Sequence, residues 1–263
     1  MNSQPSISAF FPAYNDGGTI ASMVITTVQT LRRLTDDFEV IVVHNGSTDY
    51  TMDVLTELQT LYPKELRVID YPHPLGYGGA LRVGFAACTK ELIFYTDGDA
   101  QYNPMEIADL LPKMVDGVDV VNGYKIMRHD PLHRVIIGKL YHTGVKFLFG
   151  LHVKDVDCDF RLLRRTAFDK VKLQRNSGVI CVELMKKIED AGLVVAQVPV
   201  HHFHRAYGAS QFFNFPRIFR SLLGLLDLWW ELVVMKRLGR TPAERPLPGA
   251  LGLPETVDTL DKR

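Results

Sequence analysis

Short apolar runs alternate with helix-like periods along the first half of the chain. The runs are typical of buried strands, and the periods, with apolar residues three and four apart, predict helices. The predicted strands are Ile7–Phe11, Glu39–Val43, Leu66–Ile69, Leu92–Thr96 and Val118–Val121. The predicted helices are Ile20–Leu34, Met52–Leu61, Ala80–Ala87 and Met105–Val115. This order indicates an α/β fold with a Rossmann-like, mostly parallel central sheet flanked by helices.

The second half has a different rhythm. A basic stretch, Lys125–Lys139, leads into a predicted helix that ends near Gly150. The elements predicted after it are a strand at Phe160–Leu163, a helix at Val182–Ala191, a strand at Val194–Val200 and a long helix from Phe212. We therefore expect one domain over residues 1–210, a docking helix over 211–240 and a mobile tail over 241–263, which holds several prolines and shows no periodicity.

Charge and targeting signals narrow the choice of partners. Thirty Lys and Arg residues balance thirty Asp and Glu residues, so no overall field attracts nucleic acid. Three widely spaced cysteines favour a reducing compartment over a disulfide framework or a zinc site. Met1–Ser8 lacks the features of a signal peptide, and we find no apolar run long enough to span a membrane. These features predict a cytoplasmic protein.

Two carboxylates, Asp97 and Asp99, follow the apolar strand Leu92–Thr96 directly. In open α/β sheets, ligands bind at the carboxyl ends of the strands. Mg²⁺ and Mn²⁺ prefer oxygen ligands, which Asp97, Asp99 and the amide of Gln101 would supply. The alternative is a solvated acidic turn.

Three segments together carry a resemblance to a known family. They are Pro12-Ala13-Tyr14-Asn15-Asp16, His44-Asn45-Gly46-Ser47-Thr48-Asp49 and Asp97-Gly98-Asp99-Ala100-Gln101, which follow the first, second and fourth strands. The chain resembles family 2 glycosyltransferases with the GT-A fold, and more narrowly the dolichyl- or polyprenyl-phosphate mannose and glucose synthases. That resemblance implies an inverting, metal-dependent transfer of a hexose from a GDP- or UDP-sugar to a polyprenyl or dolichyl phosphate.

The resemblance also implies roles for single residues. Asp97, Asp99 and Gln101 would hold Mg²⁺ or Mn²⁺. The residues expected to be catalytic are Asp99, Asp157, Arg134 and Glu183. The residues expected to bind the donor are Pro12, Tyr14, Asp16, His44, Asn45, Gly78, Gly79, Asp97, Lys125, Arg128, Arg205 and Ser210. Arg161 would orient Asp157 or contact phosphate, and Glu183 has an alternative role as a structural acid bonded to Arg161.

Several of these assignments have alternatives. Gly78 and Gly79 would let the backbone approach the donor, but they also fit a plain tight turn. The basic residues after Lys125 also fit a solvated helix face. Relatives usually carry two acidic residues where this chain has His44 and Asn45. A neutral imidazole and an amide still offer hydrogen bonds to a base, so donor preference stays open.

The last predicted helix has one narrow polar stripe, formed by Arg217, Arg220, Gly224, Asp227 and Glu231. Leucine, valine and tryptophan occupy the rest of its surface, which is too apolar for a freely solvated helix. We expect residues 212–237 to meet a membrane surface or a membrane-protein partner, which makes the protein peripheral at the inner face of a membrane. A homodimer contact is the alternative.

Two other functions remain open. A non-catalytic nucleotide-sugar-binding subunit of a membrane complex is suggested by His44, Asn45 and the last helix. A sugar nucleotidyltransferase shares the sheet and the metal chemistry, but the segment after the first strand lacks a glycine-rich, arginine-containing phosphate loop.

Overall fold

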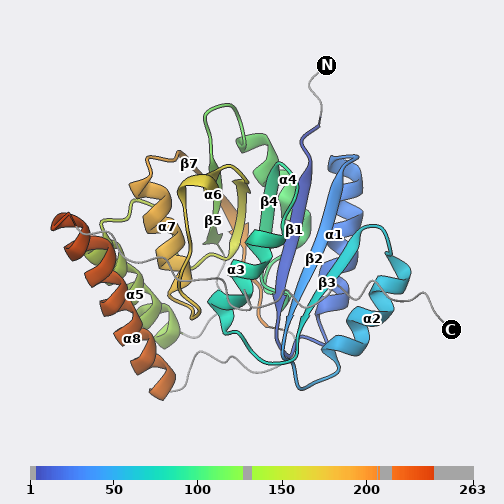
Figure 1. Ribbon diagram of the computed structural model, residues 1–263, viewed down its shortest axis with the longest axis horizontal. Helices are drawn as coiled ribbons and strands as arrows, with labels where there is room; N and C mark the ends of the chain where they lie inside the picture. Colours follow the sequence, from blue (N-terminus) through green and yellow to red (C-terminus); the bar gives the residue numbers. More distant parts are fainter. Residues whose placement is uncertain (1–3, 127–131, 206, 208–214, 240–263) are drawn as a thin grey trace.

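Seven strands form one sheet in the computed structural model, which describes residues 4–126, 132–205, 207 and 215–239, without the side chains of 132–140 and 215–218 (Figure 1). The strands are β1 (Ile7–Ala13), β2 (Phe38–Asn45), β3 (Leu66–Tyr71), β4 (Leu92–Thr96), β5 (Val120–Ile126), β6 (Phe160–Arg164) and β7 (Val195–His201). Their order is β3-β2-β1-β4-β6-β5-β7. Strand β6 is antiparallel to β4 and β5, and the other neighbouring pairs are parallel. The mostly parallel sheet is confirmed.

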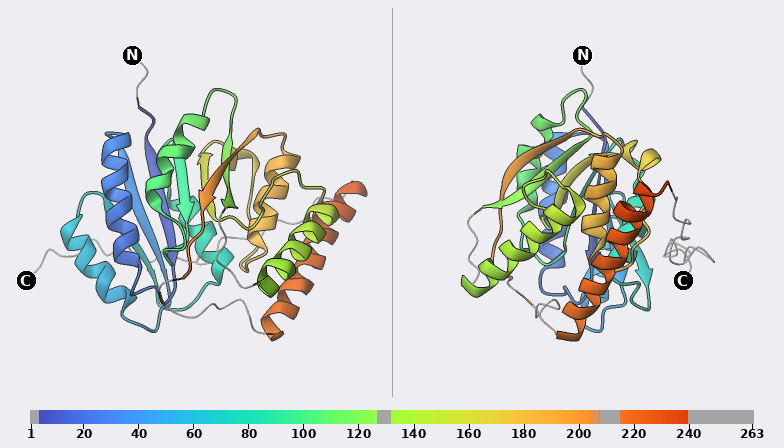
Figure 2. Two further views of the ribbon diagram at one scale, coloured as in Figure 1. Left: turned by 180° about the vertical axis from the view of Figure 1, so that it is seen from behind. Right: turned by 90° about the vertical axis from the view of Figure 1, so that its left-hand side faces the viewer.

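Helices cover both faces of this sheet (Figures 1 and 2). One apolar cluster joins the sheet to α1 (Ile20–Leu34), α2 (Thr51–Leu61) and α4 (Ile107–Leu110). The cluster on the other face contains side chains from α3 (Tyr77–Ala87), α5 (Leu132–Phe149), α7 (Ile180–Asp190) and α8 (Phe215–Trp229), with α6 (Ala167–Lys170) packed against it. Alternate residues of each strand enter the two clusters, as the pleat of a strand requires.

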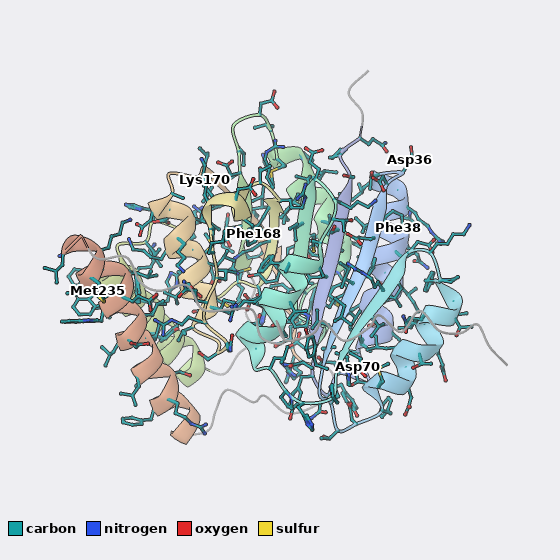
Figure 3. All side chains as sticks on the ribbon, viewed as in Figure 1. Asp36, Phe38, Asp70, Phe168, Lys170 and Met235 are labelled. Atoms are coloured by element: carbon teal, nitrogen blue, oxygen red, sulfur yellow. The ribbon has the colours of Figure 1, made fainter. Side chains whose placement is uncertain are left out.

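The strand order creates a switch point at one edge of the sheet. The chain builds β1, β2 and β3 outward in one direction and then places β4 on the other side of β1. The carboxyl ends of β1 and β4 therefore lie side by side, with the amino end of antiparallel β6 next to them. Figure 3 shows Asp70, near the end of β3, at this edge, and Asp36 and Phe38 at the opposite one. Ligands of open α/β sheets bind at such a switch point.

One segment predicted as a continuous helix is broken into three short pieces. Met105–Val115 was expected as a single helix, but the structure has a 3-10 turn (η1, Pro104–Glu106), the short α4 and a second 3-10 turn (η2, Leu111–Lys113). Pro112 lies inside this segment and has no backbone N–H to continue the helix.

Helix α8 lies beside α5, on the side of α7 away from the sheet (Figures 1 and 2), and continues as a π-helical segment, η3 (Trp230–Met235). Leu225, Leu228 and Leu232 are buried in the core, and Trp229 Nε1 donates to the carbonyl of Leu148 at the end of α5 (3.0 Å). Asp227 and Glu231 of the predicted polar stripe both pair with Arg175. No helix in the described part of the chain has the length and apolar composition of a membrane span.

Candidate active site

Four carboxylates from three different segments meet at the switch point. Asp16 follows β1, Asp97 and Asp99 follow β4, and Asp159 precedes β6. Asp97 interacts electrostatically with all three of the others. Tight turns direct the side chains here: Asn15 and Ala100 both adopt positive φ (56° and 57°), which is uncommon outside glycine. The predicted acidic pair is therefore part of a larger acidic cluster, which we call the acidic site.

Burial and mutual repulsion raise the pKa values of this site. Desolvation raises the pKa of Asp16 to about 7, and the nearby Asp99 carboxylate adds to the effect. Burial raises the pKa of Asp159 to about 6, although Lys125 opposes the rise. The pKa of Asp97 lies well above its usual value because of burial and of the Asp159 and Asp99 charges. A cation would lower the energy of the ionised site.

Two basic side chains already partly neutralise the site. The guanidinium of Arg205 is bonded to Asp99 and opposes the rise that burial causes in the pKa of Asp99. The Lys125 ammonium donates to the carbonyl of Asp157 (2.6 Å). Burial alone would lower the pKa of Lys125, but the carboxylates of Asp155, Asp157 and Asp159 raise it above its usual value. Two predicted donor-binding residues, Lys125 and Arg205, thus lie at the acidic site.

The segment that follows β7 crosses the edge of the sheet. Phe203 exchanges hydrogen bonds with Gln101: its N–H donates to the Gln101 carbonyl (2.8 Å), and its own carbonyl accepts from Gln101 Nε2 (3.2 Å). Further along, the Tyr207 ring lies so close to Gly18 that a Cβ there would come within 2.4 Å of it. Residues 203–205 contact the loop after β4, and Tyr207 contacts the loop after β1.

Arg161 holds Asp159 of the acidic site in place, and its predicted contact with phosphate is wrong. Its side chain is fully buried. It donates to Asn122 Oδ1 (2.6 Å), the Tyr95 hydroxyl, the Val156 carbonyl and Asp159 Oδ1 (3.1 Å). These bonds use the guanidinium to hold Asp159, so none of it faces a ligand. The predicted pairing of Arg161 with Glu183 is also absent from the contacts of both side chains.

His44 and Asn45 do not offer polar atoms to a base, contrary to the prediction. His44 Nδ1 lies 2.6 Å from Asp70 Oδ1, and His44 Nε2 accepts from the backbone N–H of Ser47 (3.2 Å). Asn45 Oδ1 accepts from Leu75 N (2.7 Å), and its Nδ2 donates to the Gly76 carbonyl (3.4 Å). Both side chains are buried, and these bonds tie together the loops after β2 and β3.

Gly78 and Gly79 also do not present their amides to a donor. Both N–H groups donate to the carbonyl of Asn176, at 3.0 and 3.3 Å. A Cβ on Gly78 would meet the Arg175 carbonyl at 2.4 Å. These glycines are needed because the loop around Asn176 packs against the start of α3.

Glu183 is a structural residue, and its predicted catalytic role is wrong. Its carboxylate is fully buried and accepts the backbone N–H groups of Gln174 and Arg175 at 2.9–3.1 Å. Lys187 also pairs with it (2.7 Å). The residue therefore fixes the loop that covers the start of α3.

The remaining predicted residues are placed as follows. Pro12 is buried in β1, and Tyr14 is exposed just beyond it. Asp157 is partly buried, and its N–H donates to Asp155 Oδ1 (3.1 Å). Arg128 and Ser210, the side chain of Arg134 and the tail 241–263 lie outside the described residues.

Two members of the site were missed from the sequence. Asp159 belongs to the acidic segment that pointed to Asp157, and its position directly before a strand was the available signal. Tyr77 donates its hydroxyl to Asp97 (2.8 Å), a contact between residues on different elements that no sequence pattern marks.

The residues at this edge fit a divalent cation that a ligand helps to bind. Within the described ranges, no three His, Cys, Asp or Glu side chains are grouped so as to hold a metal ion by themselves. Asp97 and Asp99 supply carboxylate oxygens. Because Gln101 Nε2 is bonded to Phe203, its amide oxygen is the atom that can turn toward a cation. Diphosphate oxygens would complete such a shell.

A seven-stranded sheet of this order, with an acidic pair at its switch point, defines a GT-A type α/β protein. Residues 8–172 match the family model described as Glycosyl transferase family 2. That match covers more than half of the chain, so the chain belongs to glycosyl transferase family 2. The predicted family is confirmed.

Similar proteins agree with this membership. The chain is 25% identical over 227 residues to an undecaprenyl-phosphate 4-deoxy-4-formamido-L-arabinose transferase of Pseudomonas fluorescens (strain Pf0-1), a match covering 86% of this chain and 64% of that relative. Glucosyl-3-phosphoglycerate synthase from Mycobacterium tuberculosis, solved with Mn²⁺, UDP and glucosyl-3-phosphoglycerate, is similar with a TM-score of 0.61 and 20% identity, over 91% of this chain and 81% of that one. The same enzyme with Mn²⁺, UDP-glucose and phosphoglyceric acid gives 0.63 and 19%, with the same coverage. At such identities the structural likeness concerns the fold.

Proposed function

We propose that this protein is an inverting glycosyltransferase that moves a hexose from a UDP- or GDP-sugar to a polyprenyl phosphate. The observation that carries the proposal is the acidic site at the switch point of a family 2 chain. The similar transferase from Pseudomonas fluorescens is named for an undecaprenyl-phosphate acceptor, which supports the acceptor class.

Asp97, Asp99 and the Gln101 amide oxygen would hold Mg²⁺ or Mn²⁺. The ion would supply positive charge to the diphosphate as it leaves the sugar. The fit rests on the carboxylates of Asp97 and Asp99 at one edge of the sheet. Burial, as the largest cause, raises the pKa of both, so a bound cation would favour their ionised forms. The similar synthase was solved with Mn²⁺ and UDP, which supports the same choice of cofactor.

Lys125 and Arg205 are assigned to the diphosphate. Arg205 is bonded to Asp99, so its guanidinium lies next to a residue that would hold the metal ion. A diphosphate offers this guanidinium a planar pair of oxygens in exchange for the carboxylate. Lys125 is held beside Asp157 and carries its full charge, because its pKa is raised.

The acceptor is assigned to the part of the edge formed by β6, β5 and β7. Asp157 lies there, between Lys125 and the start of β6. A phosphate acceptor is already ionised at neutral pH and attacks the anomeric carbon without a strong base. In that case Asp157 positions the acceptor or Lys125, whereas a hydroxyl acceptor would require a carboxylate to remove its proton.

We assign the exposed face of α8 to a membrane surface. Apolar side chains lie on one side of this helix and on the last turn of α5: Phe147, Leu148, Phe219, Leu222, Leu223, Leu226 and Trp230. Phe147 is 87% exposed and Phe219 is 63% exposed. We call this set the apolar face. Asp227 and Glu231 pair with Arg175, which leaves less net negative charge to oppose an anionic bilayer.

The activity test uses the full chain with Mn²⁺, a polyprenyl phosphate and a panel of UDP- and GDP-sugars. We expect a glycolipid from at least one donor. Asp99→Asn should lower the transfer rate at least about 100-fold, because the metal ion that stabilises the leaving diphosphate would lose a carboxylate ligand. Asp109→Asn, an exposed carboxylate on α4, is the matched control and should keep full activity. A fully active Asp99→Asn variant would refute the metal role. Donor binding without any lipid product would favour the non-catalytic subunit.

The membrane test measures co-sedimentation with vesicles of phosphatidylglycerol and phosphatidylcholine. The double variant Leu226→Gln, Trp230→Ser should bind vesicles at least about 10-fold more weakly, since each buried apolar side chain contributes about 1.5–3 kcal/mol. Leu61→Gln changes a leucine on α2 that is at least as exposed as Leu226, at the far end of the molecule, and should bind as the unaltered chain does. The homodimer would be favoured instead if the unaltered chain is a dimer, the double variant is a monomer, and neither binds vesicles.

A further inference from the structure

The pair formed by His44 and Asp70 occupies both nitrogens of the imidazole but, within the described part of the chain, only one oxygen of the carboxylate. His44 Nε2 accepts the backbone N–H of Ser47, so the ring proton must be on Nδ1, and Nδ1–H donates to Asp70 Oδ1 (2.6 Å). The His44 side chain is 6% exposed and that of Asp70 is 37% exposed. Both ring nitrogens are thus bonded, whereas the Asp70 carboxylate is partly exposed and, among the described residues, is bonded to His44 through Oδ1.

The pair lies where the nucleoside of a donor would reach. His44 and Asp70 are partners in register at the carboxyl ends of β2 and β3. Neighbouring strands are about 4.8 Å apart, so the ends of β2 and β3 lie about 10 and 14 Å from the end of β4. That is the span of an extended nucleoside diphosphate whose phosphates lie at Asp97 and Asp99.

In the other direction, the ends of β6, β5 and β7 are assigned to the acceptor, so the nucleoside is assigned to the β2 side. The segment from Phe203 to Arg205 is bonded to Gln101 and Asp99 on the β7 side. On the β2 side, the loops after β1, β2 and β3 are bonded to one another: Asn15 N donates to Ser47 Oγ (3.1 Å), and Asn45 holds Leu75 and Gly76. These bonds connect the three loops, and the partly exposed Asp70 carboxylate lies beside them at the end of β3.

We propose that Asp70 determines the base of the donor by accepting an N–H from its hydrogen-bonding edge, with His44 as the positioning residue. This inference rests on the proposed function. A carboxylate selects bases with an N–H at that edge, which are uracil (N3–H) and guanine (N1–H and the exocyclic amine). Cytosine and adenine offer a carboxylate only their exocyclic amine, because their ring nitrogens at that edge are acceptors that repel it, so they are expected to bind more weakly.

The fixed tautomer of His44 makes the consequence of one substitution specific. In Asp70→Asn, the amide must turn its oxygen toward His44 Nδ1–H, because a second donor facing that N–H would leave both unpaired. The amide NH₂ then faces the base. The variant therefore offers a donor where the native chain offers an acceptor, so the preferred base is expected to change as well as the affinity.

The test measures binding of UDP, GDP and CDP to the full chain by calorimetry, with Mn²⁺ present. We expect the native chain to bind UDP or GDP more tightly than CDP. In Asp70→Asn, the affinity for the preferred nucleotide should fall about 10- to 100-fold, the range for a hydrogen bond to a charged group, while that for CDP should rise. His44→Leu should weaken the binding of the preferred nucleotide and leave the rank order of the three affinities unchanged, as expected for a positioning residue.

The matched control is Asp36→Asn, an exposed carboxylate at the opposite edge of the sheet, which should leave all three affinities unchanged (Figure 3). An unchanged rank order in Asp70→Asn would overturn the inference. Equal losses for UDP, GDP and CDP would also overturn it, because Asp70 would then act through the fold. These readouts use nucleotides without a sugar, so they remain informative if no glycolipid is formed. A failed lipid assay combined with a switched base preference would refute the proposed function alone.

Discussion

Replacing Asp16 with asparagine should stabilise the metal-free protein at high pH. Asp16 is 6% exposed, and its pKa rises from 3.8 to about 7, first because of burial and then because of the charge of Asp99. A rise of that size corresponds to about 4 kcal/mol at a pH above both values. Asparagine keeps an oxygen for the N–H of Tyr14 and removes the charge. Since the other carboxylates of the site remain, we expect a gain of about 2–4 kcal/mol, or about 5–10 °C in Tm.

The sign of the pH dependence follows from the two pKa values. The unfolded chain loses the Asp16 proton near pH 4, whereas the folded chain keeps it until about pH 7. The free energy of unfolding therefore falls as the pH rises through this window and is constant below it. Asp16→Asn removes this loss, so its advantage should be full at pH 8 and nearly absent at pH 4.

The assay is thermal unfolding followed by circular dichroism at both pH values, with a chelator present. Asp36→Asn is the control, because Asp36 is exposed at the opposite edge of the sheet and should change Tm by less than about 1 °C. Equal gains for Asp16→Asn at pH 4 and pH 8 would refute the reasoning, since the cost would then not come from ionisation. A loss of stability at pH 8 would refute it as well.

Three further predictions concern the rest of the site. Gly78→Ala should destabilise the fold by at least about 2 kcal/mol in chemical unfolding, because its Cβ would lie 2.4 Å from the Arg175 carbonyl; Gly144→Ala, a helix position with open space around it, should be neutral or stabilising. Arg175→Met should cost about 3 kcal/mol by the same measurement, because the buried Glu231 carboxylate loses its partner; an unchanged midpoint would show that this pair is not needed. Chelation should abolish transfer. Adding Mn²⁺ at about 100 times its Kd should stabilise the protein by about 2.7 kcal/mol, and Asp99→Asn should lack that gain in thermal unfolding.

Hydrophobic periodicity predicted most of the fold because the buried elements follow it closely. The prediction for α1 coincides with the observed Ile20–Leu34, and that for β4 with Leu92–Thr96. The antiparallel direction of β6 could not be predicted, because an apolar run of five residues looks the same whether the strand is parallel or antiparallel to its neighbours. Pro112 indicated a break in the helix predicted at Met105–Val115, but the prediction followed the apolar pattern instead.

The site was only partly predictable. Asp97 and Asp99 were recognised because a local motif follows a strand, and Arg205 and Lys125 also lie with them. Two of the errors concern residues whose partners are distant in sequence. His44 is bonded to Asp70, and Gly78 is bonded to Asn176, almost a hundred residues away. Sequence reasoning assigned these groups to a ligand because nothing local shows that the protein itself satisfies them.

The position of β6 constrains how the chain folds during synthesis. Strand β5 is made before β6, yet β6 lies between β4 and β5 in the finished sheet. While the ribosome is still producing residues 127–159, β4 and β5 must therefore either remain apart or separate again. During that interval the outer edge of β4 has unpaired backbone groups, and such an edge readily captures strands from other chains. Since Asp159 and Arg161 arrive with β6, the acidic site is completed only when this gap closes.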